Sequence, residues 1–311
     1  MTDIRRKLKK RWGRKFKDLR EWSSYNEQLV KRGEFLLDFG FVKDWNAELM
    51  QMNAGKRGSP YIFPKSLIEI QSVWHAKRIP VRMIEGMTRE LVKLGNLPAF
   101  DDYSTITRRI NQLEYLLELP QGDCIIFFSD GTSMQAVSGG EYLREKYGKK
   151  NRRWIQIVLL GDVEHHEPIS YEINIIPTSE SESTQKQVED LLKQDVPIVA
   201  GGGDGAMDDF NLWAFFEFEG LIPIIKPDKN ALPASESKLR NKEVKMRNSK
   251  GYKKWSKSRG YGHRWPATEG INSAIKRIFG EQLSATSEKG LVHEAASKVW
   301  AYQRIKRYGE A

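Results

Sequence analysis

Five short runs of apolar, β-branched and aromatic residues, separated by polar turns, follow one another along the chain. They span residues 124–133, 153–162, 168–176, 196–200 and 221–227. Runs of this length and composition are typical of β-strands. Helical segments at 183–194 and 207–220 separate the last three runs, so the order is three strands, helix, strand, helix, strand. This order predicts a mixed α/β sheet and not repeated β-α-β winding.

A helical pattern precedes the strands. Residues 79–95 carry Pro80 at a helix-start position and Gly95 as a stop signal, with apolar side chains at helical spacing between them. A polar turn follows, and Ser104 is a candidate N-cap for a second helix that runs from about residue 105. The sequence therefore predicts two helices joined by a turn.

The second of these helices carries Arg108 and Arg109. Two helices joined in this way can form a helix-turn-helix, in which the second helix reads DNA. Helix pairs that simply pack together are commoner, so the pattern alone favours packing and leaves DNA binding open. Arg108 and Arg109 are candidate DNA contacts under the second interpretation.

Basic residues are concentrated in two places. The 311 residues include 51 Lys and Arg against 41 Asp and Glu, a formal net charge of +10 at pH 7, which favours a partner of dense negative charge such as nucleic acid. Ten of the first 20 residues are Lys or Arg, a composition typical of a solvated arm that meets nucleic acid. Residues 238–264 hold eleven more, with Glu243 as the single acid among them.

Aromatic residues are interleaved with the second basic segment. Tyr252, Trp255 and Tyr261 lie among its lysines and arginines. Lys253 and Lys254 could contact phosphates while the neighbouring Trp255 ring stacks on a base or sugar. The alternative is a solvated helix or loop with its aromatic rings tucked inward, and the sequence favours neither.

The composition excludes several classes of protein. Cys124 is the only cysteine, which rules out an intramolecular disulfide and a multi-cysteine zinc site. No apolar run approaches the roughly 20 residues that span a bilayer, and the charged N-terminus lacks the apolar stretch of a signal peptide. We expect a soluble protein of the cytoplasm that has no membrane partner.

A glycine-rich turn follows the fourth run. Gly201, Gly203 and Ala206 satisfy the GxGxxA fingerprint of dinucleotide-binding folds, and Asp228 lies at about the distance expected of an acid that binds the ribose. A dinucleotide-dependent oxidoreductase is therefore one hypothesis. In such folds, however, the fingerprint normally follows the first strand, whereas here it follows the fourth. We expect no bound dinucleotide, and Asp204 in this turn needs another role.

Asp204 has a counterpart at the end of the first run. Asp130 follows an apolar strand directly, as Asp204 does. In a sheet of strand order 3-2-1-4-5 the first and fourth strands are neighbours, so the two acids would lie side by side. Carboxylates held that close repel each other unless protons or cations intervene, and Mg²⁺ prefers oxygen ligands.

Residues 261–281 supply a candidate third acid. If a helix begins near Pro266, its apolar residues form a buried stripe, while Glu269 and Lys276 fall on the other side, seven positions apart. Glu269 could then face a metal and Lys276 a phosphate. On spacing alone, an exposed helix face without a specific role is the better interpretation.

The three acids together resemble those of the DDE transposases of bacterial and archaeal insertion sequences. Asp130 lies on a first strand, Asp204 in the sequence GDGAMD on a fourth strand, and Glu269 on a late helix. Segments 55–64 and 82–110 are similar to the family's N-terminal region, so the resemblance extends from about residue 30 to the C-terminus.

One branch of this family has a signature around its glutamate: Tyr, two residues, Arg, three residues, Glu, six residues, Lys. Tyr261, Arg264, Glu269 and Lys276 follow it with one departure, because four residues separate Arg264 from Glu269. The extra residue affects the aim of Arg264 but not the spacing from Glu269 to Lys276.

The resemblance implies an RNase H-like mixed sheet, ordered 3-2-1-4-5 and flanked by helices, in residues 121–311. Residues 1–120 would form a basic arm and a helical DNA-binding region. A basic insert at about 228–262 would grip the transposon end or flanking DNA, with Lys253, Lys254 and Trp255 as contacts.

It also implies the chemistry and the partners. Asp130, Asp204 and Glu269 would be the catalytic residues and the ligands of Mg²⁺ or Mn²⁺, two ions in all. Tyr261, Arg264 and Lys276 would position DNA phosphates, Arg as a bidentate fork and Lys as a point charge. The partners would be double-stranded DNA of the terminal repeats and target, and a second copy of the chain on that DNA, in the cytoplasm and nucleoid of a prokaryote.

A DNA-binding relic or regulator without catalysis is the alternative within the same fold. The chain retains all three acids, and the extra residue before Glu269 is the one feature in favour of decay.

Overall fold

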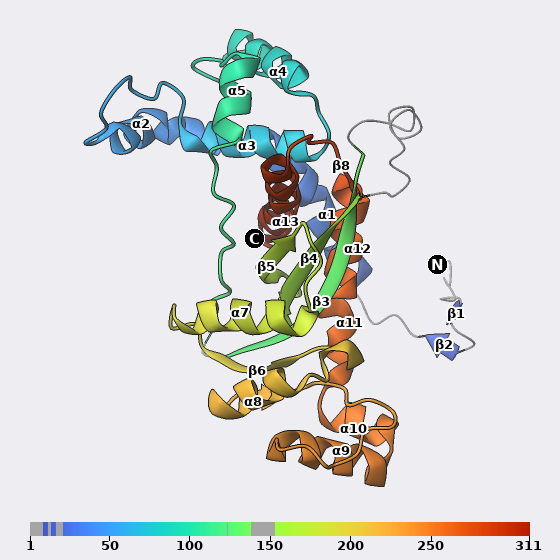
Figure 1. Ribbon diagram of the computed structural model, residues 1–311. Coiled ribbons are helices and arrows are strands. Elements are labelled where there is room, and N and C mark those ends of the chain that lie inside the picture. The colour runs from blue at the N-terminus through green and yellow to red at the C-terminus, as the bar shows by residue number, and fades with distance from the viewer. Residues whose placement is uncertain (1–8, 12–13, 17–20, 123, 138–152) are drawn as a thin grey trace, which may run out of the picture.

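The computed structural model describes residues 9–11, 14–16, 21–122, 124–137 and 153–311 of the chain. Its main sheet has the strand order β5-β4-β3-β6-β7 (Figure 1). The strands are β3 (Ile125–Ala136), β4 (Arg153–Asp162), β5 (Pro168–Asn174), β6 (Ile198–Gly202) and β7 (Ile222–Pro223). Numbered along the chain this is 3-2-1-4-5, so the predicted α/β class and RNase H-like strand order are confirmed.

Part of one edge of β3 is left without a partner strand among the described residues. β3 runs antiparallel to β4 and parallel to β6, and β6 runs parallel to β7. β6 pairs with β3 only as far as Phe128, and the short β8 (Gln282–Leu283) pairs with β3 only at Gln135 and Ala136. Between Phe128 and Gln135 the edge of β3 that faces β6 therefore has no strand partner among the described residues.

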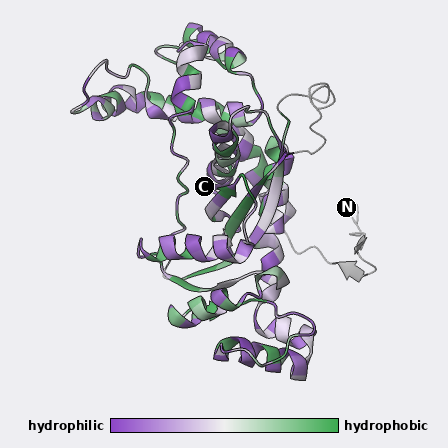
Figure 2. Cartoon of the chain, in the orientation of Figure 1, coloured by the Kyte–Doolittle hydropathy of each residue, from purple (hydrophilic) through white to green (hydrophobic). Residues whose placement is uncertain are grey.

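Helices cover both faces of the sheet because the central strands bury side chains on both sides; β4 is mostly green in Figure 2. Phe127 and Leu160 face one side, where they pack against Val188 and Trp213 of two helices, α7 (Glu180–Leu192) and α8 (Phe210–Phe218). On the other side, Ile157 belongs to a core with two further helices, α12 (Glu269–Phe279) and α13 (Glu288–Glu310).

Among the described residues, five α-helices precede the sheet. They are α1 (Trp22–Glu34), α2 (Trp45–Asn53), α3 (Lys65–Ala76), α4 (Val81–Lys93) and α5 (Tyr103–Ile110). α2 to α5 share a core that includes Trp45, Trp74 and Ile106, whereas α1 and α3 also pack against α13. Of the predicted N-terminal arm, only 9–11 and 14–16 are described, as the paired strands β1 (Lys9–Arg11) and β2 (Arg14–Phe16); residues 1–8, 12–13 and 17–20 lie outside the described part.

The second predicted helix begins earlier than expected. The cap of α5 is Asp102 and not Ser104, because the Asp102 carboxylate accepts hydrogen bonds from the backbone N–H groups of Ser104 (2.8 Å) and Thr105 (2.9 Å). A hydrogen bond from the Ser104 hydroxyl, those from the backbone and hydroxyl of Thr105 and, least, that from the Ser104 backbone lower the pKa of Asp102. α4 agrees with its predicted start after Pro80.

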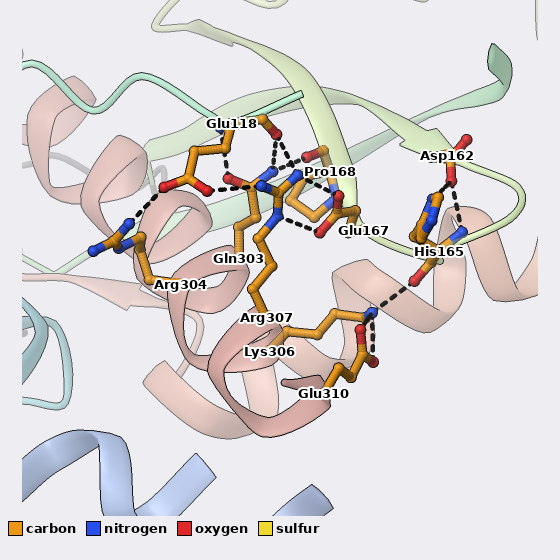
Figure 3. A network of polar contacts seen from close by, with 10 residues as sticks. All are labelled: Glu118, Asp162, His165, Glu167, Pro168, Gln303, Arg304, Lys306, Arg307 and Glu310. Carbon is orange, nitrogen blue, oxygen red and sulfur yellow. Dashed lines mark hydrogen bonds and ion pairs between the residues drawn. The ribbon is translucent and has the colours of Figure 1, made fainter. Parts of the chain in front are cut away.

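A group of charged residues, which we call the Glu118 clamp, ties the segment between α5 and β3 to α13 (Figure 3). The Glu118 carboxylate accepts hydrogen bonds from Arg304 (2.5 Å) and Arg307 (2.7 Å), and Arg307 also donates to the buried carboxylate of Glu167 (2.7 Å). Gln303 Nε2 donates to the backbone oxygens of Glu118 (2.7 Å) and Pro168 (2.8 Å). The clamp fixes the connection into the first strand of the sheet.

The basic insert is helical. It contains α9 (Lys238–Lys250) and α10 (Tyr252–Ser258), and a 3-10 turn (Tyr261–His263) and α11 (Arg264–Ala267) lead from it to α12. Figure 1 places α9 and α10 at the opposite end of the molecule from α4 and α5. Within the described residues, no helix combines the length and the apolar character needed to cross a membrane.

Candidate active site

Asp130 lies on β3 beside α12, and its side chain is 19% exposed. Asn272 of α12 donates a hydrogen bond from Nδ2 to Asp130 Oδ2 (3.3 Å). The pKa of Asp130 is raised to about 6. Burial is the main cause, the negative charges of Glu180, Glu269 and Asp204 add to it, and the positive charge of Arg264 opposes it. Asp130 is thus surrounded by acids with one nearby arginine.

Asp204 lies where the sequence predicted it, next to Asp130. The last paired residues of the parallel strands β3 and β6 are Phe128 and Gly202, and Asp130 and Asp204 each follow by two positions. Asp204 caps a 3-10 turn (Gly205–Met207), since its Oδ1 accepts a hydrogen bond from Ala206 N (2.7 Å). Neighbouring parallel strands therefore carry the two acids to the same edge of the sheet.

The glycines of this turn serve close packing. A Cβ at Gly201 would lie 2.1 Å from the Phe127 ring, and one at Gly203 would lie 2.1 Å from the Met207 sulfur. Glycine in such positions marks a close approach of side chains or backbone. The dinucleotide hypothesis loses its main support, because neighbouring side chains cover the glycines that would have to face a pyrophosphate.

Glu269 is the first residue of α12, and Arg264 joins it to Asp130. Arg264 Nη2 lies 2.6 Å from Glu269 Oε1, and Arg264 Nη1 lies 3.9 Å from Asp130 Oδ1. The helix that carries Glu269 begins three residues after Pro266, near which the sequence placed its start. α11 ends at Ala267, and Thr268, with φ −127° and ψ −78°, separates it from α12. This break accommodates the extra residue between Arg264 and Glu269.

Tyr261 lies beneath these charges and is largely buried. It packs edge-on against Phe128, and the Arg264 guanidinium carbon is 5.9 Å from the centre of its ring. Lys276 lies two turns along α12 from Glu269, and its Nζ is 3.7 Å from a carboxylate oxygen of Glu281. Tyr261 and Arg264 therefore adjoin the acids, whereas Lys276 lies farther along the same helix.

The insert directs its tryptophan inward and its lysines outward. Trp255 is fully buried, and its Nε1 donates a hydrogen bond to Glu243 Oε2 (2.8 Å). The expectation that Trp255 stacks on DNA is therefore wrong, because its ring is part of a core with Tyr261. Lys253 and Lys254 are exposed, as a phosphate contact requires.

The two arginines predicted on α5 point in different directions. Arg108 is exposed. Arg109 is buried, its guanidinium carbon lies 4.4 Å from the centre of the Tyr61 ring, and its Nη1 donates to the Phe63 backbone oxygen (3.2 Å). Arg109 thus stabilises the helical region, and only Arg108 of this pair is free to reach DNA without rearrangement.

Glu180, the first residue of α7, was not found from the sequence. Its carboxylate lies over the backbone of Gly131, where a Cβ at residue 131 would be 2.0 Å from Glu180 Oε1. Burial and the charge of Asp204 raise the pKa of Glu180, and a hydrogen bond from the Gly131 backbone opposes them. The signals for it were a glycine directly after Asp130 and an acid in the first turn of the helix after the third strand.

The residues at this edge suit a divalent cation chemically, although the side chains are not gathered around one point. Among the described residues, no three carboxylate or imidazole groups converge closely enough to hold a metal ion. Asp130 nevertheless has Glu180, Asp204 and Glu269 as acidic neighbours and Arg264 as a basic one, and the buried Oδ1 of Asn272, beside Asp130, has no hydrogen-bond partner. Oxygen donors in excess of positive charge are what Mg²⁺ and Mn²⁺ require.

Comparison with known protein families gives two matches. A family model described as a transposase DDE domain matches residues 122–303, and a second model with the same description matches residues 30–138. The first match covers more than half of the chain and includes all four acids at the sheet edge. No curated protein matches the chain.

Proposed function

Because the chain belongs to the transposase DDE domain family, we propose that it is an enzyme that binds the ends of an insertion sequence and cleaves and joins DNA strands there. The observation that carries this proposal is the position of Asp130 within β3 and of Asp204 just after the end of the adjacent strand β6, with Glu269 linked to Asp130 through Arg264. Three acids of the family signature thus come from distant parts of the sequence to one edge of the sheet.

In this proposal Asp130, Asp204 and Glu269 hold two divalent cations, Mg²⁺ or Mn²⁺. The chemistry that such ions supply is Lewis-acid polarisation of the scissile phosphate and activation of the attacking oxygen. Asn272 orients the Asp130 carboxylate through its hydrogen bond. Glu269 must turn away from Arg264 to bind a cation, which is open to it because its side chain is 44% exposed.

Arg264 then becomes available to the substrate. Its planar guanidinium can form paired hydrogen bonds with a phosphate as well as with a carboxylate. The Tyr261 ring packs next to it, with the ring centre 5.9 Å from the guanidinium carbon. Lys276 would act on a phosphate two helical turns away. Exposed Lys253 and Lys254 at one end of the molecule and Arg108 at the other would hold the flanking duplex.

The partners in this proposal are double-stranded DNA of the terminal repeats and target, and a second copy of the chain assembled on that DNA. The site of action is the nucleoid of a prokaryotic cell. The excess of 51 basic over 41 acidic residues supports a nucleic-acid partner.

A DNA-binding relic or regulator without catalysis is the second candidate. The observation in its favour is that Arg264 occupies the space between Asp130 and Glu269 and that no three metal-binding groups converge among the described residues. This candidate predicts DNA binding that is independent of divalent cations.

Cleavage of a labelled duplex that carries the element's own end separates the two candidates. With Mg²⁺ or Mn²⁺, the native chain should cut at the element boundary, and chelation should abolish the cut. Asp130→Asn and Glu269→Gln should reduce the rate by about 1,000-fold or more, while Asp190→Asn, an exposed acid on α7, should cut normally. Equal rates in all variants would disprove the site, and binding without any cleavage would favour the relic.

A further inference from the structure

We propose that Glu180 is a fourth carboxylate of the active site and provides an oxygen ligand to a cation shared with Asp130 and Asp204. This inference rests on the proposed function, because it concerns the same cation site. It adds a residue from the face of the sheet opposite to Glu269.

The first argument is the direction of the β3 backbone. The N–H groups of Ile125 and Gln135 point to the edge that faces β6 and β8, where they donate to the backbone oxygens of Pro197 and Glu281. In an extended strand alternate N–H groups point to the same edge, so the N–H of Gly131 points there as well. Its hydrogen bond with the Glu180 carboxylate places that carboxylate at the unpaired edge of β3.

The second argument is that both faces of the sheet meet at this edge. Asp130 and Gly131 are consecutive, so Asp130 points toward α12 while Glu180 approaches Gly131 from α7. Asp204 follows the end of β6, which pairs in parallel with β3 up to Phe128 and Gly202. The three carboxylates do not converge on one point in the described part of the chain. An ion at the unpaired edge would therefore require their side chains to turn toward it, one from each of the three elements.

The third argument is that α7 is fixed in this position. One turn along the helix from Glu180, the Thr184 hydroxyl lies 2.6 Å from the Ser129 hydroxyl of β3. Any side chain at residue 131 would collide with Glu180, so the glycine in the middle of β3 is explained by the approach of this carboxylate. Glycine weakens the interior of a strand. Its presence at position 131 is explained because a larger residue would displace the Glu180 carboxylate.

The fourth argument is the lack of a cationic partner. No lysine or arginine in the described part of the chain forms an ion pair with Glu180, whereas Glu269 has Arg264. A half-buried carboxylate without a partner is unfavourable unless a cation or proton joins it. A divalent cation would satisfy Glu180, Asp130 and Asp204 together.

Binding of Mn²⁺ to the metal-free protein, measured by calorimetry and by electron paramagnetic resonance, tests the inference. Glu180→Gln should weaken Mn²⁺ binding by about tenfold or more. Glu182→Gln, which removes an exposed acid from the same first helical turn, should leave the affinity unchanged. Gly131→Ala should also weaken binding, because its methyl group displaces the Glu180 carboxylate. Circular dichroism should show the native fold in both Glu180→Gln and Gly131→Ala. Without metal, the Tm of Glu180→Gln should be no lower than that of the native chain, because the substitution removes a half-buried charge.

The outcomes separate this inference from the proposed function. If Asp130→Asn loses Mn²⁺ binding while Glu180→Gln and Gly131→Ala bind as the native chain does, the role of Glu180 is wrong and the transposase site stands. If the native chain does not bind Mn²⁺ and does not cleave DNA, both are wrong. If both Glu180→Gln and Asp130→Asn lose binding while Glu182→Gln keeps it, the fourth carboxylate is established.

Discussion

The Glu118 clamp and the sheet edge around Asp130 both gather charged side chains, but they balance them differently. In the clamp, Arg304 and Arg307 face Glu118 and Glu167. Burial alone would raise the pKa of Glu118, yet the two arginines outweigh it and lower that pKa. At the sheet edge Asp130 has three acidic neighbours and one arginine, Arg264, and the pKa values of Asp130 and Glu180 are raised. The charges of the clamp balance one another within the chain. At the sheet edge, negative charge exceeds positive charge, and a bound cation would neutralise the excess.

Neutralising one acid in each region tests this difference in charge balance. Glu167→Gln should lower the free energy of unfolding by about 3 kcal/mol, because it removes the buried carboxylate that pairs with Arg307 and leaves Arg307 to share Glu118 with Arg304. Urea unfolding at pH 7.5 measures this change. The matched control is Glu288→Gln, which removes the exposed partner of Arg153 and should change stability by less than about 0.5 kcal/mol. Equal stability of the native chain and Glu167→Gln would remove the structural role of the clamp.

Asp130→Asn should have the opposite sign and a smaller size. The folded pKa of Asp130, about 6, lies above its ordinary value of 3.8, so its contribution to stability is fully present below about pH 4 and is lost as the pH rises through 6. At pH 7.5 without metal, Asp130→Asn should therefore be more stable than the native chain by about 2 kcal/mol. Urea unfolding at pH 7.5 and pH 4 measures the difference, which should disappear at the lower pH. A destabilised Asp130→Asn at pH 7.5 would show that the edge is already balanced.

The third and smallest expected effect concerns DNA binding by the exposed lysines of the insert. Neither Lys253 nor Lys254 forms an ion pair with another described residue, in contrast to the arginines of the clamp. Lys253→Ala with Lys254→Ala should reduce the slope of log affinity for duplex DNA against log salt concentration by about 2. Fluorescence anisotropy at several salt concentrations measures this slope. Lys193→Ala, which removes a lysine paired with Asp190, is the control, and an unchanged slope in the double variant would exclude the insert from DNA contact.

The features that could be predicted from the sequence are those set by the strands. Apolar runs predicted the five strands β3 to β7, although the short β1, β2 and β8 were not predicted. The strand order 3-2-1-4-5 came with the RNase H-like fold that the family resemblance implied, and this order placed Asp130 beside Asp204. Helical spacing placed Ile271 and Ile275 in the core. The positions of the strands and the buried face of this helix depend on local periodicity, so the residue pattern is sufficient to predict them.

The remaining features depend on contacts between distant segments. Glu180 reaches Gly131 only because α7 packs on β3, and a first-turn glutamate has many other uses. Trp255 among lysines is typical of a DNA-stacking residue, yet its ring is buried and donates a hydrogen bond to Glu243. Arg264 contacts Glu269 across the helix break at Thr268, which the sequence did not predict.

The most direct test of the account is to locate Mn²⁺ by anomalous diffraction in crystals of the chain grown with that ion. We expect an anomalous peak at the unpaired edge of β3, in contact with Asp130 and Asp204, with Arg264 withdrawn from Asp130. Crystals that contain Mn²⁺ at other sites but show no peak at this edge would contradict the claim that the acids form a cation site.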